Sequence, residues 1–286
     1  MWAVIIHGGA GAVGREPRAT VEPVLDAILA AAEAALIGDA AALDVVEGAV
    51  RGMEDSGLFV AGKGARPNRA GQYELDASIM DGSSRRTGAV AALAGAYPPI
   101  AIARAVMERT GHVLLAGEGA RAFALAQGFT AIANPDAFFA PRLGAAGPAP
   151  GHGTVGAVAL DTRGRIAAAT STGGTERKLP GRVGDSPIVG AGTWADGRTG
   201  VSCTGKGEFF IRTAAAHQVA MRLGLGGAAL REAVEATLAD IAGLDGEGGI
   251  IALDAAGAAH YAFNTKAMRV ALATSGGRRE VRLALA

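Results

Sequence analysis

The feature that most constrains the fold is an abrupt change of composition in the middle of the chain. Residues 142–153 read RLGAAGPAPGHG, and an apolar, strand-like run, TVGAVAL, starts at Thr154 with no spacer between them. Segments rich in Pro and Gly commonly link separate domains. Here each half contains helix and strand patterns, but neither half has an obvious self-sufficient sheet. We therefore expect one layered α/β domain that includes both halves.

The hydrophobic pattern predicts an alternation of helices and strands. Apolar residues at helical spacing predict helices over 20–37, 41–54, 98–110, 117–127, 208–223 and 228–242. Short apolar runs between turn residues predict strands over 2–8, 75–80, 88–94, 154–160, 165–170, 188–192, 199–203, 248–254 and 258–264. Gly164 and Gly257 lie in turn sequences between neighbouring strand runs, so both are expected in hairpins.

Charge and hydropathy exclude several classes of partner. Lys plus Arg and Asp plus Glu both number 27, and no basic run is interleaved with aromatics, so nucleic acid is not expected as a partner. The apolar runs near 24–37 and 87–103 contain acidic residues or prolines, so no membrane span is expected. The chain start lacks a secretory pattern and Cys203 is the single cysteine, which favours a cytoplasmic location. Cys203 lies in an apolar run and is expected to be a small buried hydrophobe.

The position of Thr154 indicates a specific chemistry. A threonine hydroxyl is a weak nucleophile at neutral pH and needs a base close by. A cut between Gly153 and Thr154 would free an α-amine beside that hydroxyl, and such an amine, with a pKa of about 7.7–8.0, is basic enough to take its proton. Gly153 tolerates the strained backbone that a scissile bond requires. The alternative is a threonine that merely starts a strand, which is the more frequent case on sequence grounds alone.

The residues that follow Thr154 favour the catalytic interpretation. Thr172 ends a strand run and could support the nucleophile through a hydrogen bond. Arg182 and Asp185 could hold the carboxylate and the amine of an α-amino acid, although a local surface ion pair would show the same spacing. Thr204 and Gly205 could supply a hydroxyl and a backbone N–H as an oxyanion hole, or form a simple turn.

Several motifs together resemble one enzyme family. HGGAGA, ELDASIMDG, GTVGAVALD, STGG, LPGRVGDSP and SCTGKGE are similar to the plant-type L-asparaginase / isoaspartyl aminopeptidase family over about residues 4–265. The resemblance implies an Ntn-hydrolase, an αββα four-layer sandwich of two stacked, mostly antiparallel sheets flanked by helices. It also implies autoproteolysis into an α subunit, 1–153, and a β subunit, 154–286, of one domain, and pairing of two αβ units as a dimer.

The resemblance also implies a function for individual residues. The implied substrates are isoaspartyl dipeptides and L-asparagine, and no cofactor is expected for catalysis. The implied site consists of the nucleophile Thr154, its partner Thr172, the oxyanion-hole residues Thr204 and Gly205, and the substrate-binding residues Arg182, Asp185 and Gly207. The segment 53–65 is expected to bind a structural Na⁺ through the backbone carbonyls of Met53, Glu54, Ser56, Phe59, Ala61 and Lys63.

One departure from the family pattern is expected to slow self-cleavage. The chain reads FVAGKGA where the family usually has FNAGKGA, so Val60 replaces an asparagine near the scissile bond, and the segment before Thr154 is short. Two alternatives remain open. A glycosylasparaginase-like amidase would share the nucleophile and the amino-acid clamp, although the GTVGAVALD and TGKGE forms favour the peptidase. An uncleaved, inactive homologue would bind a small amino acid. Among the five histidines, which lack metal-ligand spacing, His7 and His152 are expected near the site.

Overall fold

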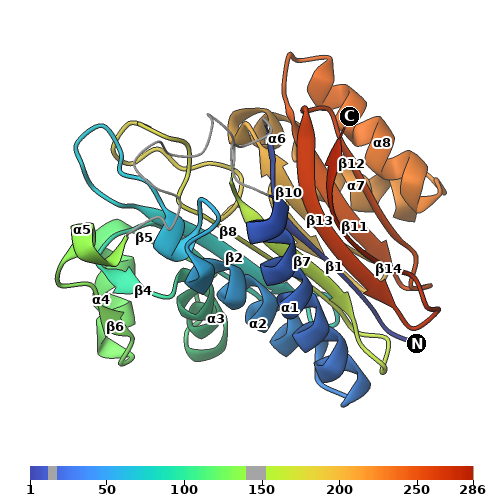
Figure 1. Ribbon diagram of the computed structural model, residues 1–286, viewed down its shortest axis with the longest axis horizontal. Helices are drawn as coiled ribbons and strands as arrows, with labels where there is room; N and C mark the ends of the chain where they lie inside the picture. The colour runs from blue at the N-terminus through green and yellow to red at the C-terminus, as the bar shows by residue number, and fades with distance from the viewer. Residues whose placement is uncertain (12–17, 140–152, 286) are drawn as a thin grey trace.

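The computed structural model of the chain describes residues 1–11, 18–139 and 153–285 (Figure 1). Its largest element is an eight-stranded sheet with the strand order β14-β13-β1-β7-β8-β2-β3-β5. Neighbouring strands are antiparallel except β3 and β5, which are parallel. The strands are β1 (Ala3–Gly11), β2 (Leu75–Asp81), β3 (Thr87–Leu93), β5 (Leu114–Ala116), β7 (Val155–Leu160), β8 (Ile166–Thr172), β13 (Ala267–Thr274) and β14 (Arg279–Leu285).

A four-stranded antiparallel sheet, in the order β12-β11-β10-β9, packs against one face of the larger sheet. It consists of β9 (Thr193–Ala195), β10 (Thr199–Gly205), β11 (Gly248–Asp254) and β12 (Ala259–Phe263), while β4 (Ala96–Tyr97) and β6 (Thr130–Ala131) form a separate pair. Apolar side chains fill most of the space between the two large sheets, among them Ile5, Val158, Ile251, Leu253 and Val270. Burial of such side chains is the main favourable contribution to this packing.

Helices cover the outer faces of both sheets (Figure 1). The long helices α1 (Arg18–Ile37), α2 (Ala42–Ser56) and α3 (Pro99–Arg109) pack on the eight-stranded sheet, and α7 (Ala215–Gly224) and α8 (Leu230–Ala242) pack on the four-stranded one. The shorter helices are α4 (Gly117–Ala126), α5 (Pro135–Phe138), α6 (Gly207–Thr213) and the 3₁₀ turn η1 (Gly62–Gly64). The predicted α/β class, with mixed sheets flanked by helices, is confirmed. Among the described residues, no helix is both long and apolar enough to cross a bilayer.

The eight-stranded sheet takes strands from both sides of the segment 142–153. β1 pairs with β13 and β7, and β2 pairs with β8, so strands of the first half of the chain lie between and beside strands of the second half. Neither half contains this sheet by itself. Of the segment 142–153, residues 142–152, which include His152, lie outside the described residues.

Most predicted elements are confirmed, and two are wrong. The predicted strand 188–192 is a turn, in which the amide of Gly190 donates to the carbonyl of Thr193, and β9 begins only at Thr193. The helix predicted over 208–223 is two helices, because Ala214 adopts a left-handed conformation with a φ of 48°. This break lets α7 leave in a new direction and pack on β10.

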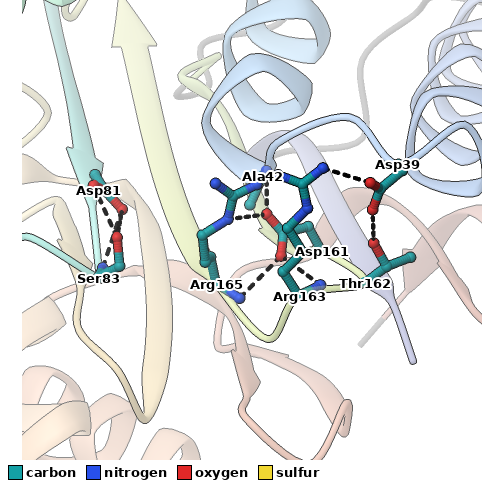
Figure 2. A network of polar contacts seen from close by, with 8 residues as sticks. All are labelled: Asp39, Ala42, Asp81, Ser83, Asp161, Thr162, Arg163 and Arg165. Carbon is teal, nitrogen blue, oxygen red and sulfur yellow. Dashed lines mark hydrogen bonds and ion pairs between the residues drawn. The ribbon is translucent and has the colours of Figure 1, made fainter.

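The hairpin of β7 and β8 is fastened at its turn by Asp161 (Figure 2). One carboxylate oxygen of Asp161 accepts hydrogen bonds from the amides of Arg163 and Arg165, and the other accepts from the Arg165 side chain at 2.8 Å. That second oxygen also accepts from the amide of Ala42 at 3.0 Å, at the start of α2. Since Ala41 offers no side-chain cap, Asp161 satisfies an amide that the helix start would otherwise leave unpaired.

Candidate active site

Thr154 lies immediately before β7, with 6% of its surface exposed. Its hydroxyl donates to Oγ1 of Thr172, the last residue of β8, at 3.0 Å. The antiparallel register that pairs Val155 with Ser171 brings these two ends together. The amide of Gly174 also donates to Oγ1 of Thr172, at 3.0 Å, so two donors fix the position of that oxygen.

Gly153, on the other side of the candidate scissile bond, packs tightly against Val60. A Cβ built on Gly153 would lie 2.6 Å from the Val60 amide nitrogen and 2.5 Å from Cγ2 of its side chain. The carbonyl of Val60 accepts a hydrogen bond from the amide of Gly173 at 2.7 Å, which ties this segment to the residue after Thr172. Only glycine fits at position 153, and Val60 contacts it directly.

Thr204 and Gly205 end β10, so they belong to the opposite sheet from Thr154. The amide of Ala10 donates to Oγ1 of Thr204 at 3.4 Å, which leaves the Thr204 hydroxyl proton for another acceptor. Gly205 has a φ of 154°, and a Cβ there would lie 2.7 Å from the Phe210 ring, so no larger residue fits. The structure thus places a hydroxyl and a glycine at the end of this strand.

Arg182 and Asp185 do not pair with each other. The Arg182 guanidinium donates through Nε and Nη2 to the two carboxylate oxygens of Glu208, both at 2.9 Å. Asp185 is almost fully buried, and burial raises the pKa of its carboxyl to about 7, partly opposed by the nearby Arg182 charge. Oδ2 of Asp185 has no hydrogen-bond partner within the described part of the chain. A buried carboxylate oxygen in this condition is suited to receive a cationic group.

Gly207 lies against this carboxylate. A Cβ at Gly207 would come within 2.7 Å of Oδ1 and 2.8 Å of the amide nitrogen of Asp185. Glycine at this position therefore leaves room beside the carboxylate of Asp185.

A buried charge cluster, which the sequence did not predict, lies beside the loop that carries Arg182. Lys178 is buried, and its ammonium donates to the carbonyl of Glu74 at 3.1 Å. The carboxylates of Glu74 and Asp76 lie 3.7 and 3.9 Å from the same nitrogen. Burial raises the pKa of Asp76 to about 6, opposed first by the Lys178 charge. Glu74 also accepts from the amide of Gly181 at 2.8 Å, so the cluster holds the loop that carries Arg182 against β2.

The segment 53–65 contains the last turn of α2, in which Met53, Glu54 and Ser56 lie, and the turn η1. A Cβ at Gly62 would lie 2.6 Å from the carbonyl oxygen of Glu54, and one at Gly64 would overlap that of Phe59. The carbonyl of Met53 accepts from the Ser56 hydroxyl at 2.7 Å, and the carbonyl of Ala61 accepts from the amide of Gly64 at 3.1 Å. Carbonyl oxygens suit hard cations, so the donor chemistry fits the expected Na⁺. No cluster of three His, Cys, Asp or Glu side chains suited to a metal occurs among the described residues.

Two further predicted residues are buried. His7, on β1, is fully buried, and burial lowers the pKa of its imidazole to about 3, partly opposed by a hydrogen bond to the Thr154 backbone. The His7 side chain thus contacts the main chain of the candidate nucleophile Thr154. Cys203 is fully buried, and burial raises the pKa of its thiol, as expected of a small core residue.

The chain is similar to known proteins over nearly its whole length. A family model described as Asparaginase matches residues 1–146 and 140–283. The chain is 44% identical to an isoaspartyl peptidase of Salmonella typhimurium over 291 residues, covering 93% of each protein. It is 43% identical to an isoaspartyl peptidase of Escherichia coli, covering 93% of this chain and 90% of the relative. A plant-type L-asparaginase of Pyrococcus horikoshii is 40% identical, covering 96% of this chain and 97% of the relative.

These similarities first define a class, since the relatives are named as enzymes that hydrolyse amide bonds. The chain is accordingly a hydrolase. More narrowly, it belongs to the asparaginase family.

Proposed function

We propose that this enzyme hydrolyses β-aspartyl amide bonds, those of isoaspartyl dipeptides and of L-asparagine, with Thr154 as the nucleophile. The observation that carries the proposal is the buried hydroxyl pair at the end of the β7–β8 hairpin, where Oγ1 of Thr154 lies 3.0 Å from Oγ1 of Thr172. The names of the relatives supply the substrate class.

Thr154 becomes a nucleophile when the chain is cut before it. Cleavage between Gly153 and Thr154 frees an α-amine that takes the hydroxyl proton, since its pKa lies at about 7.7–8.0. The products are an α subunit, 1–153, and a β subunit, 154–286, of one Ntn-hydrolase domain with four αββα layers. The close packing of Gly153 on Val60 supports this position for the cut.

The substrate is held by its α-amino-acid end. The α-carboxylate binds Arg182, and the α-ammonium binds the unpartnered oxygen of Asp185, beside Gly207. These charge-assisted contacts fix the β-carbonyl of the substrate for attack.

The reaction then takes two similar steps. Oγ1 of Thr154 attacks the β-carbonyl while its proton passes to the α-amine, and the Thr204 hydroxyl and Gly205 N–H stabilise the oxyanion. The C–N bond breaks, and the leaving amine takes the proton from the Thr154 ammonium. Water then attacks the β-aspartyl ester in the same way, releasing aspartate and the free enzyme. A structural Na⁺ held by the carbonyls of the segment 53–65 would stabilise the loop that carries Val60.

A denaturing gel with N-terminal sequencing tests the proposal. Purified enzyme should run as two pieces, and the second should begin Thr-Val-Gly-Ala. Thr154→Ala should stay uncut and show no hydrolysis of isoaspartyl dipeptides or asparagine. A single intact chain with full activity would show that the assigned nucleophile is wrong.

A further inference from the structure

A row of buried polar side chains crosses the otherwise apolar space between the two sheets. Its members are fully buried and come from five strands: His7 (β1), Ser78 (β2), Thr170 (β8), Thr193 (β9) and Ser202 (β10). Buried polar groups are costly unless each is satisfied, so a row of this kind demands an explanation.

The strand registers place these residues opposite one another. His7 pairs with Gly156, Gly156 pairs with Thr170, and Thr170 pairs with Ser78, so they occupy one row across four adjacent strands of the larger sheet. In the smaller sheet, Ser202 pairs with Thr193. A Cβ at Gly156 would overlap the Ser202 hydroxyl and lie 2.5 Å from the His7 ring, so the absent side chain at Gly156 is what lets the two sheets meet here.

Hydrogen bonds join the row from one sheet to the other. The amide of Gly9 donates to Nδ1 of His7 at 3.3 Å. Nε2 of His7 shares a hydrogen bond with the Ser202 hydroxyl at 3.0 Å. The Ser202 hydroxyl in turn shares a hydrogen bond with Oγ1 of Thr170, 2.7 Å away.

Thr170 is the centre of the row. Thr193 donates to its hydroxyl oxygen at 2.6 Å. The proton of Thr170 in turn goes to the carbonyl of Gly192, at 3.2 Å. Ser78 extends the row with contacts of 2.8 Å to Thr193 and 2.6 Å to the carbonyl of Ser186. Loss of the Thr170 hydroxyl would leave the buried hydroxyls of Ser202 and Thr193, from two strands of the smaller sheet, without this hydrogen-bond partner.

The candidate catalytic residues lie one step further along the same strands. Thr172 follows Thr170 by two residues, Thr154 precedes Gly156 by two, and Thr204 follows Ser202 by two. Side chains two apart on a strand share a face. The nucleophile pair therefore belongs to one sheet and the oxyanion-hole residues belong to the other, directly beside the polar row.

We propose that this row, centred on Thr170, is a positioning device that sets the oxyanion hole relative to the nucleophile. Apolar packing between sheets is non-directional, whereas the chain of hydroxyls fixes the two sheets in both distance and register. Thr170, Ser202 and His7 act through Thr154 and Thr204 and do not touch the reacting atoms. The inference rests on the functions proposed above for those two threonines.

The test compares two substitutions of Thr170, one that removes its hydroxyl and one that removes its methyl group. Thr170→Val keeps the shape and removes the hydroxyl, so kcat per cleaved site should fall on the order of 10–100-fold while KM changes little, since small misplacements of reacting groups act on the chemical step. Thr170→Ser keeps the hydroxyl and loses the methyl group, and its kcat should stay near that of the parent. Cleaved sites are counted by N-terminal sequencing, and melting temperature is measured for each variant.

Thr199→Val is the matched control. Thr199 is also fully buried on β10, but its hydroxyl donates within the smaller sheet, to the carbonyl of Leu253 at 2.8 Å, and it lies at the other end of the strand. This variant should lose stability and keep kcat. If Thr170→Val also keeps kcat, or if Thr170→Ser loses as much as Thr170→Val, the proposal is wrong.

A second variant covers the case in which Thr170→Val does not mature. Ser202→Ala removes one donor of the row and leaves Thr170 in place, and it should lower kcat per cleaved site less than Thr170→Val would. An unchanged kcat in this variant would also overturn the proposal. Failure of the underlying assignment is recognised separately, because Thr154→Ala would then remain active.

Discussion

Val60 is the residue at which one substitution should change how fast the enzyme matures. Its side chain is buried against Gly153, with Cβ 2.7 Å from the place where a Gly153 Cβ would stand. A side-chain amide carried on that Cβ would lie beside Gly153, the residue that supplies the carbonyl of the bond before Thr154. Valine has no donor to offer an oxyanion formed there during self-cleavage, whereas asparagine in Val60→Asn does.

The expected gain follows from the value of one such donor. Removing a donor from an oxyanion hole costs about 2.7–4 kcal/mol, or roughly 10²–10³ in rate, so Val60→Asn should accelerate cleavage by up to that factor. Its turnover per cleaved site should change little, because we propose Thr204 and Gly205, and not residue 60, as the donors to that oxyanion. The amide is buried at this position, so the folded variant should lose about 1–3 kcal/mol of stability wherever the amide lacks a partner.

The assay is a time course of precursor loss on denaturing gels after rapid purification. The parent precursor should disappear over hours and Val60→Asn over minutes. Val60→Ala is the control, since it makes the same region roomier and adds no donor. If Val60→Asn matures no faster than the parent, a backbone N–H or water stabilises the oxyanion. If Val60→Ala matures as fast as Val60→Asn, steric release is the cause and the reasoning fails.

Four further predictions concern the clamp, the ion and the assembly. Arg182→Ala and Asp185→Ala should each lower kcat/KM, because each loses on the order of 2–4 kcal/mol of transition-state binding, and should leave self-cleavage intact. Wild-type kcat/KM in both variants would refute the clamp. Asp185 must be ionised to receive the substrate ammonium, and its pKa is raised to about 7, so kcat/KM should fall more steeply below pH 7 than protonation of the Thr154 α-amine alone would cause; the same steepness in Asp185→Asn would refute this role of Asp185. Replacing Na⁺ by tetramethylammonium at equal ionic strength should lower the melting temperature reversibly, by mass action, and an unchanged value would argue against a cation in the 53–65 loop. Light scattering at micromolar concentration should give a dimer of αβ units, and a single αβ unit would contradict it.

The sequence predicted the central hairpin well because its signals are local. Short apolar runs on both sides of a glycine turn define β7 and β8, and the turn at Gly164 has the expected left-handed glycine, with a φ of 77°. The strand β14 had no such signal. It is an edge strand in which charged residues such as Arg279 and Glu280 interrupt the apolar pattern, and it is a strand because it pairs with β13.

The sequence predicted those residues of the candidate site whose chemistry and spacing are both visible in it. It did not predict the residues whose role depends on being buried. Thr154 and Thr172 could be paired from their places at two strand ends. Lys178 could not be recognised, since a lysine in a charged, turn-rich stretch is ordinarily exposed. Only the tertiary structure shows its ammonium enclosed between Glu74 and Asp76. The polar row around Thr170 could not be predicted from the sequence either, because it joins five strands that are distant in the sequence.

Arg182 shows how the structure changes the interpretation of a residue that the sequence motif pointed to. The spacing of Arg182 and Asp185 suggested that one grips a carboxylate and the other an amine, or that they pair with each other. In the structure, Glu208 takes the Nε and Nη2 edge of the guanidinium. A guanidinium has five N–H donors in a fixed plane, so the edge formed by Nη1 and Nη2 remains to bind a second carboxylate while Glu208 holds the first. A Cβ at Gly184 would lie 2.9 Å from Nη1, so the loop passes beside this second edge and a bulkier residue would obstruct it. A lysine at position 182 has no such pair of edges, and it would have to choose between Glu208 and the substrate.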